Sequence, residues 1–89
     1  DENILVDFKT SKGIYPDYLV QGSAYAKLIE ENEKRKIDKF IICRFPKDNS
    51  ETEIKEFSKE DLDNAFEYFK LLRKAFDLDK QINKLTRKK

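Results

Sequence analysis

The sequence contains no histidine, and this absence removes whole classes of active site. Without an imidazole, the chain can form neither a histidine-based catalytic triad nor a histidine metal site. Cys43 is the only cysteine, so a disulfide framework, a zinc-binding cysteine set and an iron–sulfur ligand set are excluded. Cys43 lies in the apolar run 40–45, where we expect a small core side chain. This cysteine usage fits a reducing cytoplasm, where we expect the protein to reside.

The sequence also lacks a long apolar run. No stretch approaches the roughly 20 apolar residues that cross a bilayer, and no signal peptide opens the chain, so we expect no membrane partner. The first residue is Asp1 rather than methionine, and an apolar strand follows almost at once. We therefore expect this chain to be a piece of a longer protein.

What the chain does have is charge. Charged residues make up 42% of its 89 residues and hydrophobic residues 38%, which is enough for one modest core, so residues 1–89 are expected to form a single domain. The net charge of +1 argues against a protein that coats polyanions. After Asp79, however, every charge is basic. This end either contacts a phosphate backbone or is a solvated helix end that suits the helix dipole, and we favour the second interpretation. The basic residues are Lys80, Lys84, Arg87, Lys88 and Lys89.

The first half of the chain predicts a strand and a helix. Residues 4–10 are apolar on both faces, as in a buried central strand. After a glycine turn, a helix is predicted over residues 16–35, opened by a proline at its first position. Gly22 and Ala26 are small and four residues apart, which would let this helix approach a sheet closely. They belong to an apolar stripe of Tyr18, Leu19, Gly22, Tyr25, Ala26, Leu28 and Ile29.

The second half predicts two strands and a second helix. Residues 37–46 form the most apolar strand, and residues 52–57 follow after a short polar loop at 47–50, so the two strands are expected to form an antiparallel hairpin. Ser58 and Asp61 have the spacing of a capping box, which predicts a helix after Ser58. The order β-α-β-β-α predicts parallel pairing of the first two strands through a right-handed crossover. The fold class is therefore α/β with a small mixed β-sheet. The apolar positions of the second helix are Leu62, Phe66, Phe69, Leu72 and Phe76, with a weaker pattern through Ile82 and Leu85.

Four polar side chains are predicted to converge at the end of the first strand. Asp7 and Lys9 are two residues apart on a strand and therefore point the same way. Gln21 and Tyr25 are four residues apart on a helix and therefore share a face. Taken singly, each has an ordinary explanation: a surface ion pair worth roughly 0–1 kcal/mol, an exposed glutamine and a core tyrosine. Together they favour a site for a metal ion and a phosphate.

The acid-x-lysine spacing alone carries little information, because it recurs at Glu53 and Lys55. There the strand is polar and alternating, and we expect a solvated face. Asp7 and Lys9 differ because they end an apolar strand and share their face with Leu5.

These residues resemble a known family. Residues 5–11 (LVDFKTS), Tyr18 and residues 21–26 (QGSAYA) together resemble the PD-(D/E)xK nuclease superfamily, in its RecB-like exonuclease branch. The resemblance covers the first third of the chain. It implies a restriction-endonuclease-like half domain, the C-terminal part of a nuclease that cleaves DNA with Mg²⁺ or Mn²⁺. By the same resemblance, Asp7 is the metal-binding acid, Lys9 the catalytic lysine, and Gln21 and Tyr25 the accessory pair near the active site and the DNA. The Phe8 carbonyl is a candidate further metal ligand.

The sequence departs from this family at one point. The family has a further acid on the strand before Asp7, usually in a Gly-x-x-Asp context, and that strand is not in this sequence. Asp1 and Glu2 lie too close along the same strand to replace it. We therefore expect the chain alone to be inactive, and its unpaired first strand, Ile4–Lys9, to associate with a second copy as a homodimer. Two alternatives remain open: a non-catalytic nucleic-acid-binding or structural module with this fold, and an interaction domain acting through the charged second helix.

Overall fold

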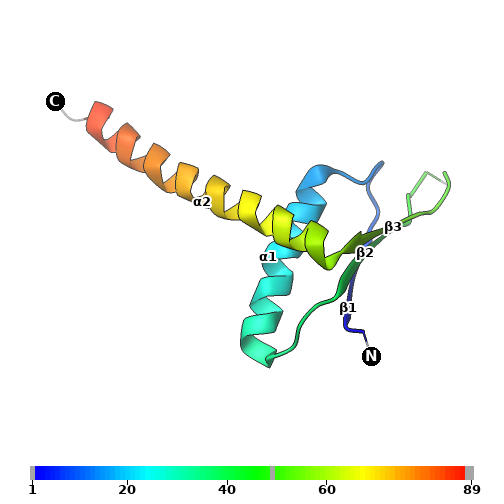
Figure 1. Ribbon diagram of the computed structural model, residues 1–89. Helices are drawn as coiled ribbons and strands as arrows, with labels where there is room; N and C mark the ends of the chain where they lie inside the picture. The colour runs from blue at the N-terminus through cyan, green and yellow to red at the C-terminus, as the bar shows by residue number, and fades with distance from the viewer. Residues whose placement is uncertain (1, 49, 88–89) are drawn as a thin grey trace.

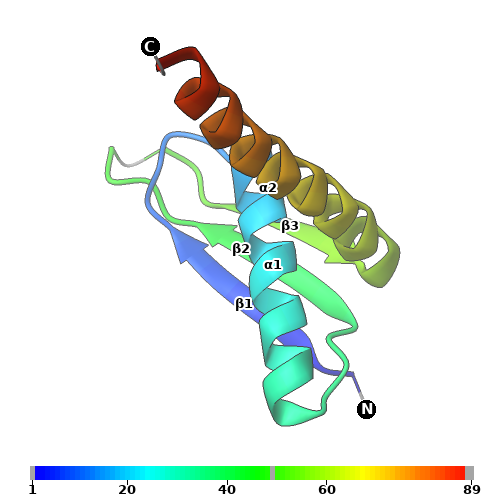
Figure 2. The ribbon, with the colours of Figure 1, turned by 90° about the vertical axis from the view of Figure 1, so that its left-hand side faces the viewer.

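The computed structural model describes residues 2–48 and 50–87. It is a mixed α/β structure in which a three-stranded sheet carries two helices on one face (Figures 1 and 2). The predicted order of elements is confirmed, and most of the predicted ends lie within two residues of the observed ones. Asp1, Asn49, Lys88 and Lys89, which entered the predictions above, lie outside the described residues. The elements are β1 (Ile4–Lys9), α1 (Pro16–Glu33), β2 (Lys39–Arg44), β3 (Glu53–Ser58) and α2 (Lys59–Arg87).

The sheet has the order β1-β2-β3, with β2 in the middle. β1 and β2 are parallel, with Asp7 opposite Ile42 and Lys9 opposite Arg44. β2 and β3 are antiparallel, with Phe40 opposite Phe57. Both predicted pairings are confirmed. The connection through α1 makes β1 and β2 run in the same direction, so their carboxyl ends lie at the same end of the sheet.

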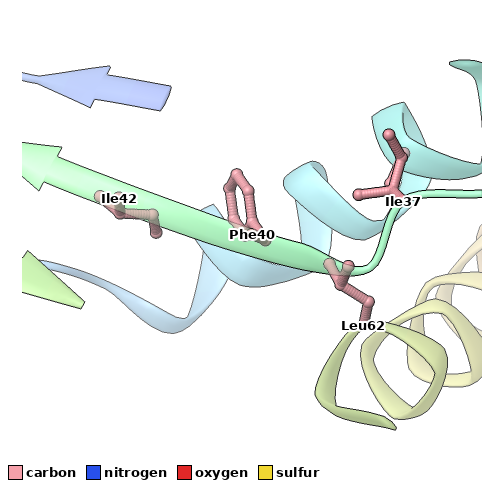
Figure 3. Packing of buried hydrophobic residues seen from close by; sticks show 5 residues of the cluster. Ile37, Phe40, Ile42 and Leu62 are labelled. Carbon is pink, nitrogen blue, oxygen red and sulfur yellow. The ribbon is translucent and has the colours of Figure 1, made fainter. Parts of the chain in front are cut away.

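The core lies between β2 and the two helices. Phe40 and Ile42 project from β2 and are fully buried, at 1% and 0% exposure. Ile37, which precedes the strand, and Leu62 of α2 close over them (Figure 3). β2 is covered because it is the central strand, and its alternate residues supply the largest apolar side chains of the buried cluster.

Gly22 lets α1 lie directly on β2. A Cβ atom at this position would lie 2.4 Å from two ring atoms of Phe40, Cε2 and Cζ, which is closer than carbon atoms pack. Ala26, one turn later, is also buried. The expectation that small residues bring this helix close to the sheet is therefore confirmed. The neighbouring Ser23 is buried as well, and its hydroxyl donates a hydrogen bond of 2.6 Å to the Val20 carbonyl within the helix.

β1 lies at an edge of the sheet in the described part of the chain. One face of it carries Ile4, Val6 and Phe8, which are 44%, 43% and 66% exposed. The prediction of a central strand covered on both faces is therefore wrong for the residues described. The physical reason is that α1 and α2 both cover the same face of the sheet, so the opposite face has no helix on it.

Two burial predictions also need correction. Tyr25 and Leu28 belong to the predicted apolar stripe of α1, yet they are 57% and 51% exposed. They lie beyond the strip that contacts the sheet, because a helix buries only the side nearest its neighbour. Cys43 is only half-buried, because β2 presents it on the uncovered face, opposite the exposed Ile54.

The capping box of α2 is confirmed. The Asp61 amide donates to the Ser58 hydroxyl at 3.1 Å, and the Ser58 amide donates to the Asp61 carboxylate at 2.9 Å. From this cap α2 runs 29 residues to Arg87. Its first turns pack on α1 and the sheet, and its later turns extend away from them (Figure 1).

Within residues 2–48 and 50–87, neither helix has a stretch that is long and apolar enough to span a bilayer.

Candidate functional site

β1 ends in an ion pair. Lys9 Nζ lies 3.1 Å from Asp7 Oδ2, and both side chains are on the face of β1 that looks toward α1. The same face carries Leu5, which packs against the buried core. The side chain of Lys9 is 27% exposed and that of Asp7 is 39% exposed. The pair is therefore partly shielded from solvent but remains accessible to a ligand.

A hollow of about 190 Å³ separates β1 from α1 beside this pair. Asp7 lines it from the strand, and Gln21 and Tyr25 line it from the helix. Three of the four predicted site residues therefore surround one space, with Leu5, Val6, Gly22 and Phe40 completing the lining. The chemical roles of the residues stay predictions.

Lys9 does not line the hollow. Its ammonium lies 4.6 Å from the centre of the Tyr18 ring, within the range of a cation–π interaction. Tyr18 in turn packs edge-on against Tyr15 at 5.4 Å between ring centres. Lys9 is thus held between the Asp7 carboxylate and an aromatic face. Both contacts restrict its side chain to the end of the strand next to the hollow.

Sequence reasoning missed Arg44, which orders the segment after Lys9. Arg44 is only 9% exposed although it carries a charge. Its guanidinium donates to the Ser11 carbonyl at 3.2 Å and to the Glu51 carbonyl at 3.3 Å, and its Nε lies 3.1 Å from a Glu53 carboxylate oxygen. The available signal was its position: Arg44 follows Phe40 and Ile42 at two-residue steps, which predicts that it shares their buried face.

Glu53 therefore differs from its prediction. It was expected on a solvated face, but it faces the helices and pairs with the buried Arg44. Lys55, two residues later, is exposed. It lies two strands across the sheet from Asp7, in the same row, because Ile42 of β2 is opposite both residues. The second acid-x-lysine pair is thus split between a structural carboxylate and a surface lysine.

Phe8 contributes through its backbone rather than its side chain. Its ring lies on the uncovered face and stacks on Phe45 at 6.0 Å. The carbonyls of Asn3 and Lys9 accept hydrogen bonds from the β2 side, at 2.8 and 2.7 Å. Because carbonyl directions alternate along a strand, the Phe8 carbonyl points to the open edge of β1. It is therefore free of the β1–β2 ladder and next to Asp7.

A metal ion at the end of β1 would find few ligands among the residues described. Across 2–48 and 50–87, no group of three or more carboxylate, thiol or imidazole side chains is placed to hold a metal ion. Asp7 and the Phe8 carbonyl would supply two oxygen ligands of the kind that Mg²⁺ prefers, whereas Mg²⁺ takes about six. Both oxygen atoms are of the kind that a hard divalent cation binds, but two such ligands are fewer than the ion needs.

Other hollows lie away from the Asp7–Lys9 pair. One of about 320 Å³ lies between α1 and α2 and shares Gln21 with the first, with Tyr68 and Leu72 on its opposite side. A larger one, of about 660 Å³, lies at the far end of α1 and is rimmed by charged side chains. Its central charges neutralise each other, since Lys27 Nζ lies 3.0 Å from Asp63 Oδ1. The hydrogen bond between them lowers the pKa of Asp63 and raises the pKa of Lys27.

Comparison with protein-family models and with curated proteins found no match to this chain. The resemblance to a nuclease superfamily therefore rests on the residues quoted above.

Proposed function

We propose that this chain supplies part of the active site of a metal-dependent DNA nuclease, exonuclease-like and of the restriction-endonuclease-like fold. The observation that carries the proposal is the meeting of Asp7, Gln21 and Tyr25 around one hollow, with Lys9 paired to Asp7 beside it. An aspartate, a lysine, an amide and a phenol from two separate elements form a set that can bind a phosphate group and its counter-ion.

The roles follow from the chemistry of each group. Asp7 and the Phe8 carbonyl hold Mg²⁺ or Mn²⁺, which when bound neutralises phosphate charge and makes a water molecule more acidic. Lys9 orients the attacking water or stabilises the negative charge that grows on the phosphoryl oxygens. Gln21 and Tyr25 donate hydrogen bonds to the DNA, because their side chains are exposed at the rim of the hollow.

The incomplete ligand set limits what the chain does alone. With one carboxylate and one carbonyl, a hard cation is held weakly, and a second carboxylate must come from outside the described residues. The open edge of β1 is the place for it, because a strand added there would present its own side chains beside Asp7. Without such a strand, β1 of a second copy is the other partner that this edge can accept.

A second candidate function is a non-catalytic module that binds nucleic acid or stabilises a larger assembly. The incomplete ligand set among the described residues favours it, since a module that binds no metal can keep this fold and its phosphate contacts. The two functions differ in one measurable respect. The nuclease needs Asp7 for cleavage, whereas the module never cleaves DNA in any context.

The test is a plasmid-cleavage assay with Mg²⁺ or Mn²⁺, on this chain and on the longest open reading frame that contains it. We expect no cleavage by the 89-residue chain and cleavage by the longer protein. Asp7→Asn and Lys9→Ala should each abolish that cleavage, and Lys55→Ala is the matched control because it removes an exposed lysine from β3. Cleavage that survives Asp7→Asn would refute the assignment, and a longer protein that binds DNA without cutting it would support the module.

Metal binding has its own readout. Mn²⁺ added to the 89-residue chain should broaden the nuclear magnetic resonance signals of Asp7 and Phe8 before those of other residues, because a paramagnetic ion relaxes the nuclei nearest to it. Asp7→Asn should remove that selectivity. Equal broadening at acids across the surface would mean that β1 holds no preferred metal position.

A further inference from the structure

The outer half of α2 exposes a series of apolar side chains. Every described residue from Lys70 to Arg87 is exposed, and Figure 1 shows this part of the helix extending away from the sheet and α1. A helix with this much exposed apolar surface is costly in water, since each such side chain gains free energy when it is covered. The large apolar residues in this segment are Leu71, Leu72, Phe76, Leu78, Ile82 and Leu85.

Five of the apolar residues in this segment follow a heptad spacing. Leu71, Ala75, Leu78, Ile82 and Leu85 are separated by four, three, four and three residues. In heptad notation Ala75 and Ile82 take position a, and the three leucines take position d. This stripe is distinct from the one that packs on the body of the molecule, which includes the buried Leu62 and Ala65.

We propose that this stripe, residues 71–85, pairs with the same stripe of a second copy to form a parallel two-stranded coiled coil. The proposal does not depend on the proposed nuclease function. A β-branched isoleucine at a with leucine at every d position favours two strands over three or four. A second copy is the partner that fits because the stripe and its flanking charges are self-complementary.

The flanking charges set the orientation. Lys74 occupies position g and Asp79 occupies the following position e, and in a parallel pair each g residue meets the next e residue of its partner. A parallel dimer thus makes two Lys74–Asp79 ion pairs, one on each side of the seam. Among the residues described, no carboxylate lies within ion-pair distance of Lys74 in the single chain. Asp79 accepts a hydrogen bond from Asn83 of the same helix.

An antiparallel pair lacks this complementarity. In an antiparallel pair, g positions of one helix face g positions of the other, and these are Lys74 and Gln81. The e positions likewise face e positions, and these are Leu72, Asp79 and Thr86. Neither set contains two opposite charges. The parallel arrangement is therefore the one that the charges select.

Phe76 provides a matched control on the same helix. It is 56% exposed, but it takes position b, away from the stripe. The Lys80 ammonium lies 4.7 Å from the centre of its ring, so Phe76 already has a partner within its own helix.

The test measures the mass of the 89-residue chain by light scattering and sedimentation over a wide concentration range. We expect a dimer that dissociates on dilution. Leu78→Lys and Ile82→Lys should each give a monomer with unchanged helix content by circular dichroism, because both residues are exposed in the single chain. Phe76→Lys should leave the dimer intact. A chain that stays monomeric at all concentrations would overturn the proposal, as would a dimer that survives both substitutions.

Charge reversal and cross-linking test the orientation. Lys74→Asp should weaken the dimer, and combining it with Asp79→Lys should restore it. In a Cys43→Ser background, Leu85→Cys should oxidise to a disulfide-linked dimer, since position d faces itself only in a parallel pair, while Lys80→Cys at position f should not. Absence of the Leu85→Cys cross-link would rule out the parallel coiled coil. A dimer that is abolished by Val6→Lys but not by Leu78→Lys would show that the interface is formed by β1 instead.

Discussion

Gly22 and Phe40 touch where α1 crosses β2, with no room between them for a side chain: a Cβ on Gly22 would lie 2.4 Å from two atoms of the Phe40 ring. Both residues also line the hollow beside Asp7. Gln21 is the residue directly before Gly22, and Tyr25 follows less than one turn later. This one contact therefore sets both the packing of α1 and the distance of Gln21 and Tyr25 from β1.

Gly22→Ala is expected to destabilise the protein. Overpacking against a buried ring costs about 1–3 kcal/mol, and the better helix propensity of alanine returns about 1 kcal/mol, so a net loss of about 1 kcal/mol is expected in urea unfolding. Gly13→Ala is the control, because its nearest neighbour, a Tyr15 ring atom, lies at 3.6 Å and its backbone is not left-handed. A Gly22→Ala variant more stable than the original would show that α1 shifts without cost.

Asp7→Asn is expected to leave stability almost unchanged while it abolishes cleavage by the longer protein. The Asp7–Lys9 pair is partly exposed, and such pairs contribute about 0–1 kcal/mol. Urea unfolding of the 89-residue chain measures the first effect and the plasmid assay the second. A large loss of stability in Asp7→Asn would indicate that the aspartate holds the fold together, and any loss of cleavage would then say nothing about chemistry.

The Lys27–Asp63 pair is expected to make stability depend on pH. Its hydrogen bond lowers the pKa of Asp63 below the ordinary value of 3.8 and raises the pKa of Lys27 above 10.5. The stabilisation from Asp63 is therefore present above pH 3.8 and is lost as pH falls through the lower folded value. The stabilisation from Lys27 is present below pH 10.5 and is lost as pH rises through the higher folded value.

Asp63→Asn tests this window. Because both side chains are partly exposed, the substitution should cost only about 0.5 kcal/mol near neutral pH. The cost should disappear in strong acid, where Asp63 is protonated in both states. Urea unfolding at the two pH values measures it, and Glu31→Gln on the exposed side of α1 is the control. An equal cost at both pH values would mean that Asp63 stabilises the fold through packing and not through its charge.

The local structure of this protein was predictable from short-range patterns. The capping box at Ser58 and Asp61 predicted where α2 begins, because the reciprocal hydrogen bonds need only residues three apart. Alternation along β1 predicted that Asp7 and Lys9 share a face. The small pair Gly22 and Ala26 predicted close packing of α1. Each of these rests on geometry that one element fixes by itself.

Burial was less predictable, because it depends on which face of the sheet the helices cover. Ile4, Val6 and Phe8 are as apolar as a central strand, yet they lie on the face that neither helix covers. Phe76 and Leu85 have the period of a packed helix, yet both are exposed, and the later part of α2 extends away from the sheet. A pattern shows that a face is apolar, and only the arrangement of elements decides what, if anything, lies on it.

For the candidate site too, some features follow from the sequence and others only from the fold. The sequence by itself determined the four residue types and their spacing, because both spacings lie within single elements. The tertiary structure alone decided that Asp7, Gln21 and Tyr25 surround one hollow, that Lys9 packs on Tyr18, and that Arg44 donates to the Ser11 carbonyl. These relationships join residues of different elements, and their distances depend on where along β2 the helix α1 packs, which the spacing of residues within one element does not encode.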